Sequence, residues 1–126
     1  MEIKPVAYEP MNEIHNNEAV ILEKLLKAIK EKAPLKDIYE EFYEDVKKHF
    51  EFEQGLMEKY GFFAKIPHEM EHNRILNELS QLKAHLDDYE MLDKYFNTHF
   101  IPWLENHIAT MDTVTAGFFN MVGAKP

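Results

Sequence analysis

Apolar residues recur at steps of three and four along most of this chain, and this spacing dictates helices rather than strands. Residues at such steps share one face of an α-helix, so each segment presents an apolar stripe to a core. No segment alternates apolar and polar residues over the length of a strand. The pattern predicts four helices, at about residues 12–32, 35–60, 67–86 and 90–114.

Prolines and glycines mark the ends of these predicted helices. Pro34 stops the first helix, and Gly61 suits the position just after the second. Pro67 suits the first turn of the third helix. Asn12 is the expected N-cap of the first helix, so residues 1–11, which contain two prolines, are predicted to form an extended arm.

Short connections between long helices place consecutive helices antiparallel to one another. The sequence therefore predicts an all-α fold, an antiparallel up-down-up-down four-helix bundle with an N-terminal arm. A chain of 126 residues has the size of one ordinary domain, so we expect a single domain over residues 1–126. Pro102 lies inside the fourth predicted helix and removes a backbone hydrogen bond, which predicts a kink or a new helix start there. Gly117 and Gly123 are expected to loosen the tail.

Five histidines and one glutamate occupy positions within the apolar stripes. They are His15 in the first predicted helix, His49 and Glu53 in the second, His68 and His72 in the third, and His107 in the fourth. An unpaired buried polar group is costly, and a buried carboxylate costs more. Packing alone does not explain six such groups facing one core. Bound metal explains them, because the ions supply compensating charge and coordination bonds.

The spacing of these residues fits metal ligation. Two pairs lie four positions apart, one turn along a single helix face: His49 with Glu53, and His68 with His72. Asp112 follows His107 by five positions, about 140° around an ideal helix. We therefore expect Asp112 to join the others through side-chain reach, a helix distortion, or both.

The ligand types narrow the choice of metal. The chain has no cysteine, which excludes disulfides, zinc–thiolate sites, iron–sulfur clusters and cysteine nucleophiles. Imidazoles and carboxylates without thiolates suit iron, and zinc, copper and manganese remain open at this point. Five imidazoles suffice for two ions, and Glu53 and Asp112 are suited to bridge them. His85 and His99 fall off the stripes and are expected to face solvent.

The net charge of the chain restricts the kinds of partner that it can bind. A formal net charge of -9 argues against nucleic acid and anionic membrane surfaces, which reward basic patches. No run approaches the roughly 18 apolar residues of a membrane span. Residues 1–11 contain no apolar segment typical of a signal peptide. We therefore expect a cytoplasmic protein that neither binds nucleic acid nor inserts into a membrane, and its protein partner is left open.

The ordered set of candidate ligands resembles the hemerythrin family, specifically its single-domain bacterial members. The family pattern is a histidine on the first helix, H-x-x-x-E on the second, H-x-x-x-H on the third and H-x-x-x-x-D on the fourth. Its fourth-helix motif, W-L-x-x-H-I-x-x-x-D, stands intact from Trp103 to Asp112. The resemblance covers nearly the whole chain in order and spacing.

This resemblance implies a non-heme di-iron protein that binds O₂ reversibly for transport, storage or delivery. One iron would be bound by His68, His72 and His107. The other would be bound by His15 and His49, and it would keep an open position for O₂. Glu53 and Asp112 would bridge the two irons (Fe²⁺ or Fe³⁺), which an oxo or hydroxo group would also bridge. The apolar wall of the O₂ pocket would include Trp103, Leu104 and Ile108.

Three departures from the family pattern leave alternatives open. Residues 12–15 read N-E-I-H, where many bacterial members have D-x-Q-H. Pro102 directly precedes the motif tryptophan, and Thr110 stands where several relatives have an aliphatic pocket residue. A Thr110 hydroxyl facing the irons would favour peroxide chemistry. A di-iron peroxidase, oxidase or nitric-oxide-handling enzyme is therefore one alternative, and an O₂ or redox sensor is another.

Overall fold

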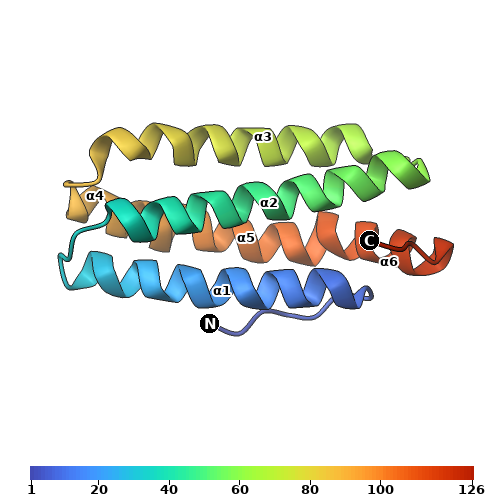
Figure 1. The fold of residues 1–126 in the computed structure, drawn as a ribbon, viewed down its shortest axis with the longest axis horizontal. Helices are drawn as coiled ribbons and strands as arrows, with labels where there is room; N and C mark the ends of the chain where they lie inside the picture. Colours follow the sequence, from blue (N-terminus) through green and yellow to red (C-terminus); the bar gives the residue numbers. More distant parts are fainter.

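Four long helical segments lie side by side along the long axis of the molecule in the computed structural model, which describes residues 1–126 (Figure 1). The first three are α1 (Glu9–Lys30), α2 (Lys36–Tyr60) and α3 (Lys65–Leu82). The fourth is a continuous rod made of α4 (Tyr89–Tyr95), η2 (Phe96–Phe100), α5 (Ile101–His107), η3 (Ile108–Asp112) and α6 (Thr113–Val122).

Successive helical segments run in opposite directions. In Figure 1, α1 and α3 run one way along the bundle, and α2 and the fourth rod run the other way. The predicted all-α, up-down-up-down four-helix bundle is confirmed, and no strand is present. None of these helices combines the length and the apolar character that crossing a membrane requires.

The N-terminal arm is shorter than predicted, because α1 begins at Glu9 and not at Asn12. Pro10 lies in the first turn of α1, where its fixed φ angle and missing N–H suit a helix start. Asn12 binds the arm instead of capping the helix: its amide donates to the carbonyl of Val6 at 2.9 Å and accepts from the N–H of Val6 at 2.8 Å. The arm therefore comprises residues 1–8 and is tied down by a side chain of α1.

The other helix ends lie close to the predicted ones. Gly61 ends α2 with a positive φ of 67°, and Phe62 N–H donates to the Met57 carbonyl at 2.9 Å, as expected of a left-handed C-terminal cap. A short 3₁₀ helix, η1 (Lys83–His85), follows α3. The Asp88 side chain caps α4 by accepting from the Met91 N–H at 3.1 Å.

The fourth rod differs most from its prediction. Pro102 lacks an N–H and its ring would clash with the carbonyl four residues earlier, and the turn before it widens into the π-helical segment η2. There the N–H of Ile101 donates to the carbonyl of Phe96, five residues back. The rod then continues to Val122 instead of ending near residue 114, and Gly123 ends it with a φ of 65°. Gly117 does not interrupt it.

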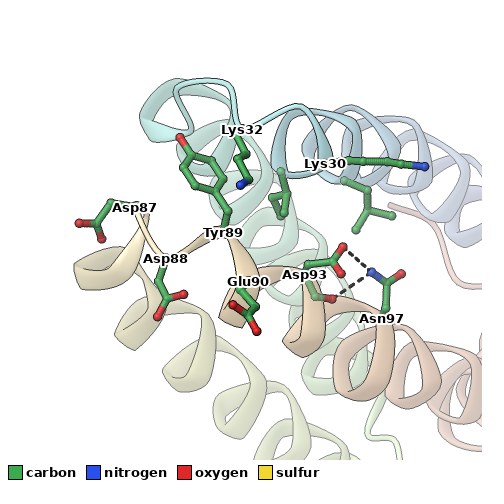
Figure 2. Close-up of a pocket in the computed structure, with 10 residues that line it drawn as sticks. Lys30, Lys32, Asp87, Asp88, Tyr89, Glu90, Asp93 and Asn97 are labelled. Carbon is green, nitrogen blue, oxygen red and sulfur yellow. Dashed lines mark hydrogen bonds between the residues drawn. The ribbon is translucent and has the colours of Figure 1, made fainter.

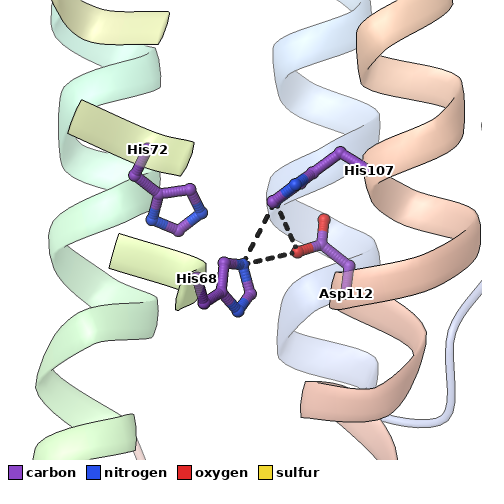
Figure 3. A group of neighbouring side chains, drawn as sticks. All are labelled: His68, His72, His107 and Asp112. Carbon is purple, nitrogen blue, oxygen red and sulfur yellow. Dashed lines mark hydrogen bonds and ion pairs between the residues drawn. The ribbon is translucent and has the colours of Figure 1, made fainter. Parts of the chain in front are cut away.

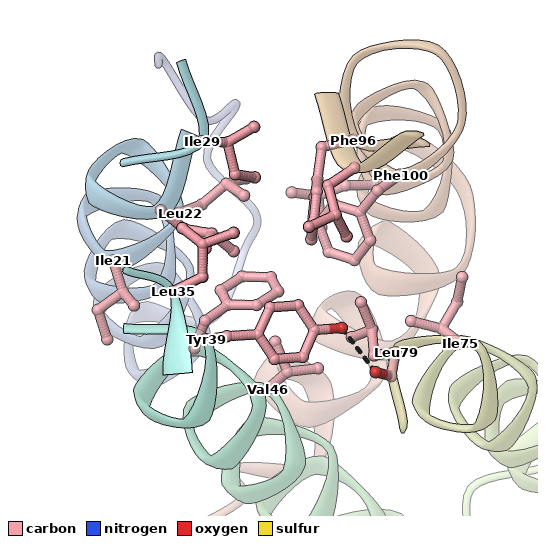
Figure 4. Packing of buried hydrophobic residues seen from close by; sticks show 14 of the residues in the cluster. Ile21, Leu22, Ile29, Leu35, Tyr39, Val46, Ile75, Leu79, Phe96 and Phe100 are labelled. Atoms are coloured by element: carbon pink, nitrogen blue, oxygen red, sulfur yellow. Dashed lines mark hydrogen bonds between the residues drawn. The ribbon is translucent and has the colours of Figure 1, made fainter. Parts of the chain in front are cut away.

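The interior of the bundle consists of two apolar clusters. In the large apolar cluster of 16 buried residues, the rings of Phe42, Phe96 and Phe100 pack edge to face with centroids 5.5–5.8 Å apart. Tyr39 lies among them, and its hydroxyl donates to the carbonyl of Leu79 at 2.6 Å (Figure 4). The small apolar cluster contains eight buried residues: Tyr8, Met11, Leu56, Met57, Phe62, Ala116, Phe119 and Ala124.

Candidate metal centre

A layer of buried polar side chains separates the two apolar clusters. Along α1, Met11 belongs to the small cluster, His15 and Glu18 are buried next, and Ile21 opens the large cluster. The polar layer contains all nine buried polar or charged residues of the chain: His15, Glu18, His49, Glu53, His68, His72, His107, Asp112 and Thr115. All seven ligands predicted from the sequence therefore lie together, although four separate helical segments supply them.

Within the polar layer the predicted ligands form two groups that share Asp112. The three-histidine group consists of His68, His72, His107 and Asp112 (Figure 3). The two-histidine group consists of His15, His49, Glu53 and Asp112. In each group, one ligand atom from every residue lies within 4.8 Å of the others. Each group is therefore compact enough to hold one metal ion.

Asp112 faces both groups with different oxygens. Its Oδ1 atom lies 3.1 Å from Nε2 of His68 and 3.1 Å from Nε2 of His107 in the three-histidine group. Its Oδ2 atom lies 3.2 Å from Nε2 of His15 in the two-histidine group. A carboxylate placed in this way offers one oxygen to each of two cations.

Glu53 repeats this arrangement from the opposite helix. Its Oε1 atom lies 3.4 Å from Nε2 of both His68 and His72. Its Oε2 atom lies 2.5 Å from Nε2 of His49 and 3.8 Å from Nε2 of His15. Both carboxylates therefore stand between the groups as bridges would.

A second π-helical segment, η3, brings Asp112 into this centre. In a π-helical turn the backbone hydrogen bond spans five residues, and the N–H of Thr113 donates to the carbonyl of Ile108. Residues five positions apart, such as His107 and Asp112, thus come to lie on one face. A helix distortion was one of the two routes that the sequence left open for Asp112, and it is present. The same shift turns Val114 outward, to 51% exposure.

The buried ligand atoms are poorly satisfied by the protein itself. Six buried side-chain atoms of the polar layer have no hydrogen-bond partner: Nδ1 and Nε2 of His15, Nε2 of His72, Oε1 of Glu53, and both carboxylate oxygens of Asp112. Unpartnered buried polar atoms are rare because each one costs free energy. Five of these six atoms face the centre of the two groups. The residues therefore fit a pair of cations, which would satisfy these atoms.

The close approach of histidines and carboxylates also shifts the pKa values of the histidines. Burial by itself would lower the pKa of His15, but the carboxylates of Asp112 and Glu53, whose oxygens lie 3.2 and 3.8 Å from its Nε2, outweigh it and raise that pKa to about 9. The pKa of His68 rises to about 9 against burial for the same reason. His72, which burial dominates, has its pKa lowered to about 3. The pKa of His49 is also raised against burial, because the carboxylates of Glu53 and Glu18 flank its ring. Protons on three imidazoles thus offset the carboxylate charge.

The second ring nitrogens of three histidines are held by residues that the sequence analysis did not single out. Nδ1 of His49 lies 2.5 Å from Oε2 of Glu18, Nδ1 of His68 lies 2.8 Å from Oγ1 of Thr115, and Nδ1 of His72 lies 3.1 Å from Oε1 of Gln54. Such partners fix the ring orientation and leave Nε2 free to face the centre. One signal was available for Glu18, which follows His15 by three positions on the same helix face.

Aromatic rings cover two of the histidines. Phe50 stacks on His72 with centroids 3.8 Å apart and an interplanar angle of 2°. Trp103 stacks on His107 at 4.6 Å and 18°, and its indole N–H donates to Oε1 of Glu71 at 2.7 Å. These stacks close the three-histidine group toward the rest of the bundle.

The structure places the residues that were predicted to line an O₂ pocket in three different surroundings. Leu104 and Ile108 are each 4% exposed and belong to the large apolar cluster, on the rod that carries His107. Trp103 is half-buried and covers His107, so it lies at the three-histidine group. Thr110 is exposed, and its hydroxyl donates to the carbonyl of Asn106 at 2.7 Å. The sequence placed Thr110 at the O₂ pocket and left open whether its hydroxyl faces the irons; the hydroxyl instead bonds its own helix on the outer side of the rod.

Surface hollows alone would not have located this centre. The largest, about 810 Å³, lies at the far end of the bundle between α1 and α4, and exposed side chains such as Lys32, Asp88 and Asp93 line it (Figure 2). A hollow of about 470 Å³ lies outside the three-histidine group and touches His68. Another, of about 300 Å³, touches His49. The two histidines off the stripes, His85 and His99, are exposed, as predicted.

Comparison with known proteins agrees with this arrangement. The family model described as "Hemerythrin HHE cation binding domain" matches residues 6–118, a range that contains all seven predicted ligands. A curated relative, "Bacteriohemerythrin" of Aquifex aeolicus (strain VF5), is 28% identical over 112 residues, which are 84% of this chain and 85% of the relative. No solved structure matches the chain.

Proposed function

This chain belongs to the hemerythrin family, and on that premise we propose that it is a non-heme di-iron protein that binds O₂ reversibly for transport, storage or delivery. The single observation that carries the proposal is the position of the two carboxylates. Glu53 and Asp112 each direct one oxygen to the three-histidine group and the other to the two-histidine group. A lone ion would leave half of these oxygens without a partner.

We assign one iron to His68, His72 and His107, and the other to His15 and His49. Glu53 and Asp112 would each contribute a ligand oxygen to both irons, and an oxo or hydroxo group would complete the pair. His15 and His49 would give their iron one protein ligand fewer, which would leave a position there for O₂. When both irons are bound and ferrous, they supply the two electrons that O₂ accepts.

The protein's contribution to reversibility is to keep water and exchangeable protons away from the centre. The two apolar clusters lie on either side of the polar layer, and Leu104 and Ile108 are the buried aliphatic side chains nearest in sequence to His107. Exclusion of water favours release of O₂ unchanged over its departure as peroxide. We therefore assign Leu104 and Ile108 to the apolar wall of the O₂ pocket.

The enzyme alternative depends on Thr110, which lines the hollow that also touches His68. The sequence offered the hydroxyl of Thr110 as a route to peroxide chemistry. That hydroxyl donates to the carbonyl of Asn106 on the outer side of the rod. The binding function is therefore the one that the geometry supports best.

Elemental analysis and visible spectroscopy together test this function. We expect about two irons per chain, and charge-transfer bands that appear when air reaches the dithionite-reduced protein and vanish on deoxygenation. Bands that pass irreversibly to an oxidised form would replace the carrier by an oxidase or peroxidase. A well-folded protein grown with ample iron that holds none, or only zinc, would overturn the di-iron assignment.

A further inference from the structure

The three histidines whose second nitrogen is held by a side chain have unlike partners. In the two-histidine group, Nδ1 of His49 lies 2.5 Å from a carboxylate oxygen of Glu18. In the three-histidine group, the partners are the hydroxyl of Thr115 and the amide oxygen of Gln54, at 2.8 and 3.1 Å. One group therefore has a charged acceptor behind its ligand, and the other has neutral ones.

Glu18 is placed where its charge acts strongly. It is 3% exposed, and His49 is its only ion-pair partner, so neither solvent nor a lysine or arginine neutralises it. Charges in such an environment are screened far less than charges at the surface. A carboxylate that accepts the Nδ1–H of an imidazole also draws that proton toward itself and increases the electron density at Nε2.

We propose that Glu18 makes the two metal positions unequal, by strengthening the binding of a cation at the two-histidine group through His49. This inference rests on the proposed di-metal function. Glu18 is a positioning residue here, since it touches a ligand and not the cation. The same charge favours the ferric over the ferrous ion at that position, because the more highly charged ion gains more from a nearby carboxylate.

Two variants test this inference by changing charge while keeping shape. Glu18→Gln keeps an oxygen that accepts from His49 but removes the charge, so a purely structural hydrogen bond would survive it. Gln54→Glu is the matched control, because it places a carboxylate behind His72 in the other group. Circular dichroism and thermal unfolding of both metal-free variants establish that they fold.

The metal-free proteins are titrated with Co²⁺. Binding is monitored by calorimetry and by the visible absorption bands of the bound ion. Wild type should bind two Co²⁺ per chain. In Glu18→Gln one equivalent should weaken by about 10–100-fold, the usual effect of removing such a partner, while the other changes little. Gln54→Glu should instead strengthen the other equivalent. In iron-loaded Glu18→Gln, a tenfold loss of ferric relative to ferrous affinity at that position would raise its reduction potential by about 59 mV.

The possible failures are distinguishable. Wild type that binds fewer than two Co²⁺ would overturn the di-metal function and this inference with it. Two equivalents that are both unchanged in Glu18→Gln, or both weakened equally, would overturn the inference alone. Should Glu18→Gln fail to fold, Gln54→Glu still decides, because unaltered binding in that variant would show that charge behind a ligand has no effect. The effect of Glu18→Gln should also disappear in a His49→Ala background.

Discussion

The large apolar cluster and the polar layer are built from the same four helical segments, by the same helical spacing. They differ in whether the protein alone supplies all the contacts that their buried side chains need. In the cluster, residues such as Phe42 and Leu79 are fully buried against one another and need nothing further. In the layer, six buried atoms have no partner within the protein. The difference teaches that the cluster holds the fold, whereas the layer is built for cations that the chain does not itself supply.

The largest loss of stability should come from a substitution in the large apolar cluster. Phe42→Ala removes a fully buried ring that packs against Phe96 and Phe100. We expect the free energy of unfolding to fall by about 3–5 kcal/mol, in metal-free and metal-loaded protein alike. Urea unfolding measures this loss. Phe63→Ala is the control, because Phe63 is 80% exposed and its loss should cost less than about 0.5 kcal/mol. Equal losses in the two variants would contradict the assigned core.

The second largest effect should be the gain in the free energy of unfolding when the polar layer binds metal. A cation at 100 times its dissociation constant adds about 2.7 kcal/mol to the free energy of unfolding when it binds only the folded state. Urea unfolding with and without Co²⁺ measures this gain. In Asp112→Asn the gain should shrink, because an amide offers one ligand oxygen where the carboxylate offers two. The metal-free variant should itself be less stable than wild type near neutral pH, because Asp112 pairs with the imidazoles of His15 and His68, so the gain is measured separately for each protein. An undiminished gain would show that Asp112 is no bridge.

The polar layer should make the stability of the metal-free protein depend on pH. The pKa values of His15 and His68 are raised to about 9 in the folded state, against about 6.5 when unfolded. The folded state thus holds more protons in this window, and stability should fall as pH rises from about 6.5 to 9, by up to roughly 1.4 kcal/mol per pH unit for each proton. His72 acts oppositely: its pKa of about 3 means that stability falls as pH drops from about 6.5 toward 3.

Metal affinity should show the reverse dependence in the upper window. Ligand imidazoles must lose their Nε2 protons to bind a cation, so affinity for Co²⁺ should rise between pH 6.5 and 9 while the metal-free protein loses stability. Urea unfolding and Co²⁺ titration over the same pH series compare the two slopes. Asp112→Asn should flatten the stability slope, because the nearby carboxylate of Asp112 helps to raise both pKa values. A flat profile in wild type would remove the layer as the source.

The fold and the seven candidate ligands could be predicted because both depend on helical spacing. His68 and His72 lie on one face of any regular helix, whatever surrounds it. Asp112 could be predicted only with a distortion, because a π turn such as η3 is not encoded in the spacing around it. The early start of α1 was missed because Pro10 was assigned to an extended arm, although proline also suits the first turn of a helix.

The partners of the histidines were less predictable. Glu18 is one of 23 acidic residues, and most acidic side chains on a helix face solvent. Only its spacing from His15 distinguishes it, and its contact with His49 depends on how α1 and α2 pack. Thr115 and Gln54 reach their histidines across helices in the same way. Contacts between helices of this kind need the tertiary structure.

A single hydroxyl within the layer should matter by roughly 1 kcal/mol. Thr115→Val keeps the volume of a fully buried side chain but removes the acceptor of the Nδ1–H of His68. The cost should lie at the lower end of that for an unpartnered buried donor, since the replacement leaves no cavity. Affinity for one equivalent of Co²⁺ should also fall, by about tenfold. Unfolding and Co²⁺ titration check both numbers, and Thr115→Ser, which keeps the hydroxyl, should restore the affinity.

The same substitution five residues earlier should have the smallest effect. Thr110 lies on the outer side of the rod, and its hydroxyl donates to the carbonyl of its own helix at Asn106. Thr110→Val should therefore change the free energy of unfolding by less than about 0.5 kcal/mol and leave both Co²⁺ equivalents unaltered. The rate at which the oxygenated iron protein oxidises should also stay at its wild-type value. A marked change in that rate would mean that residue 110 controls access to the centre from outside the layer, and that the boundary between layer and surface is not where the buried side chains place it.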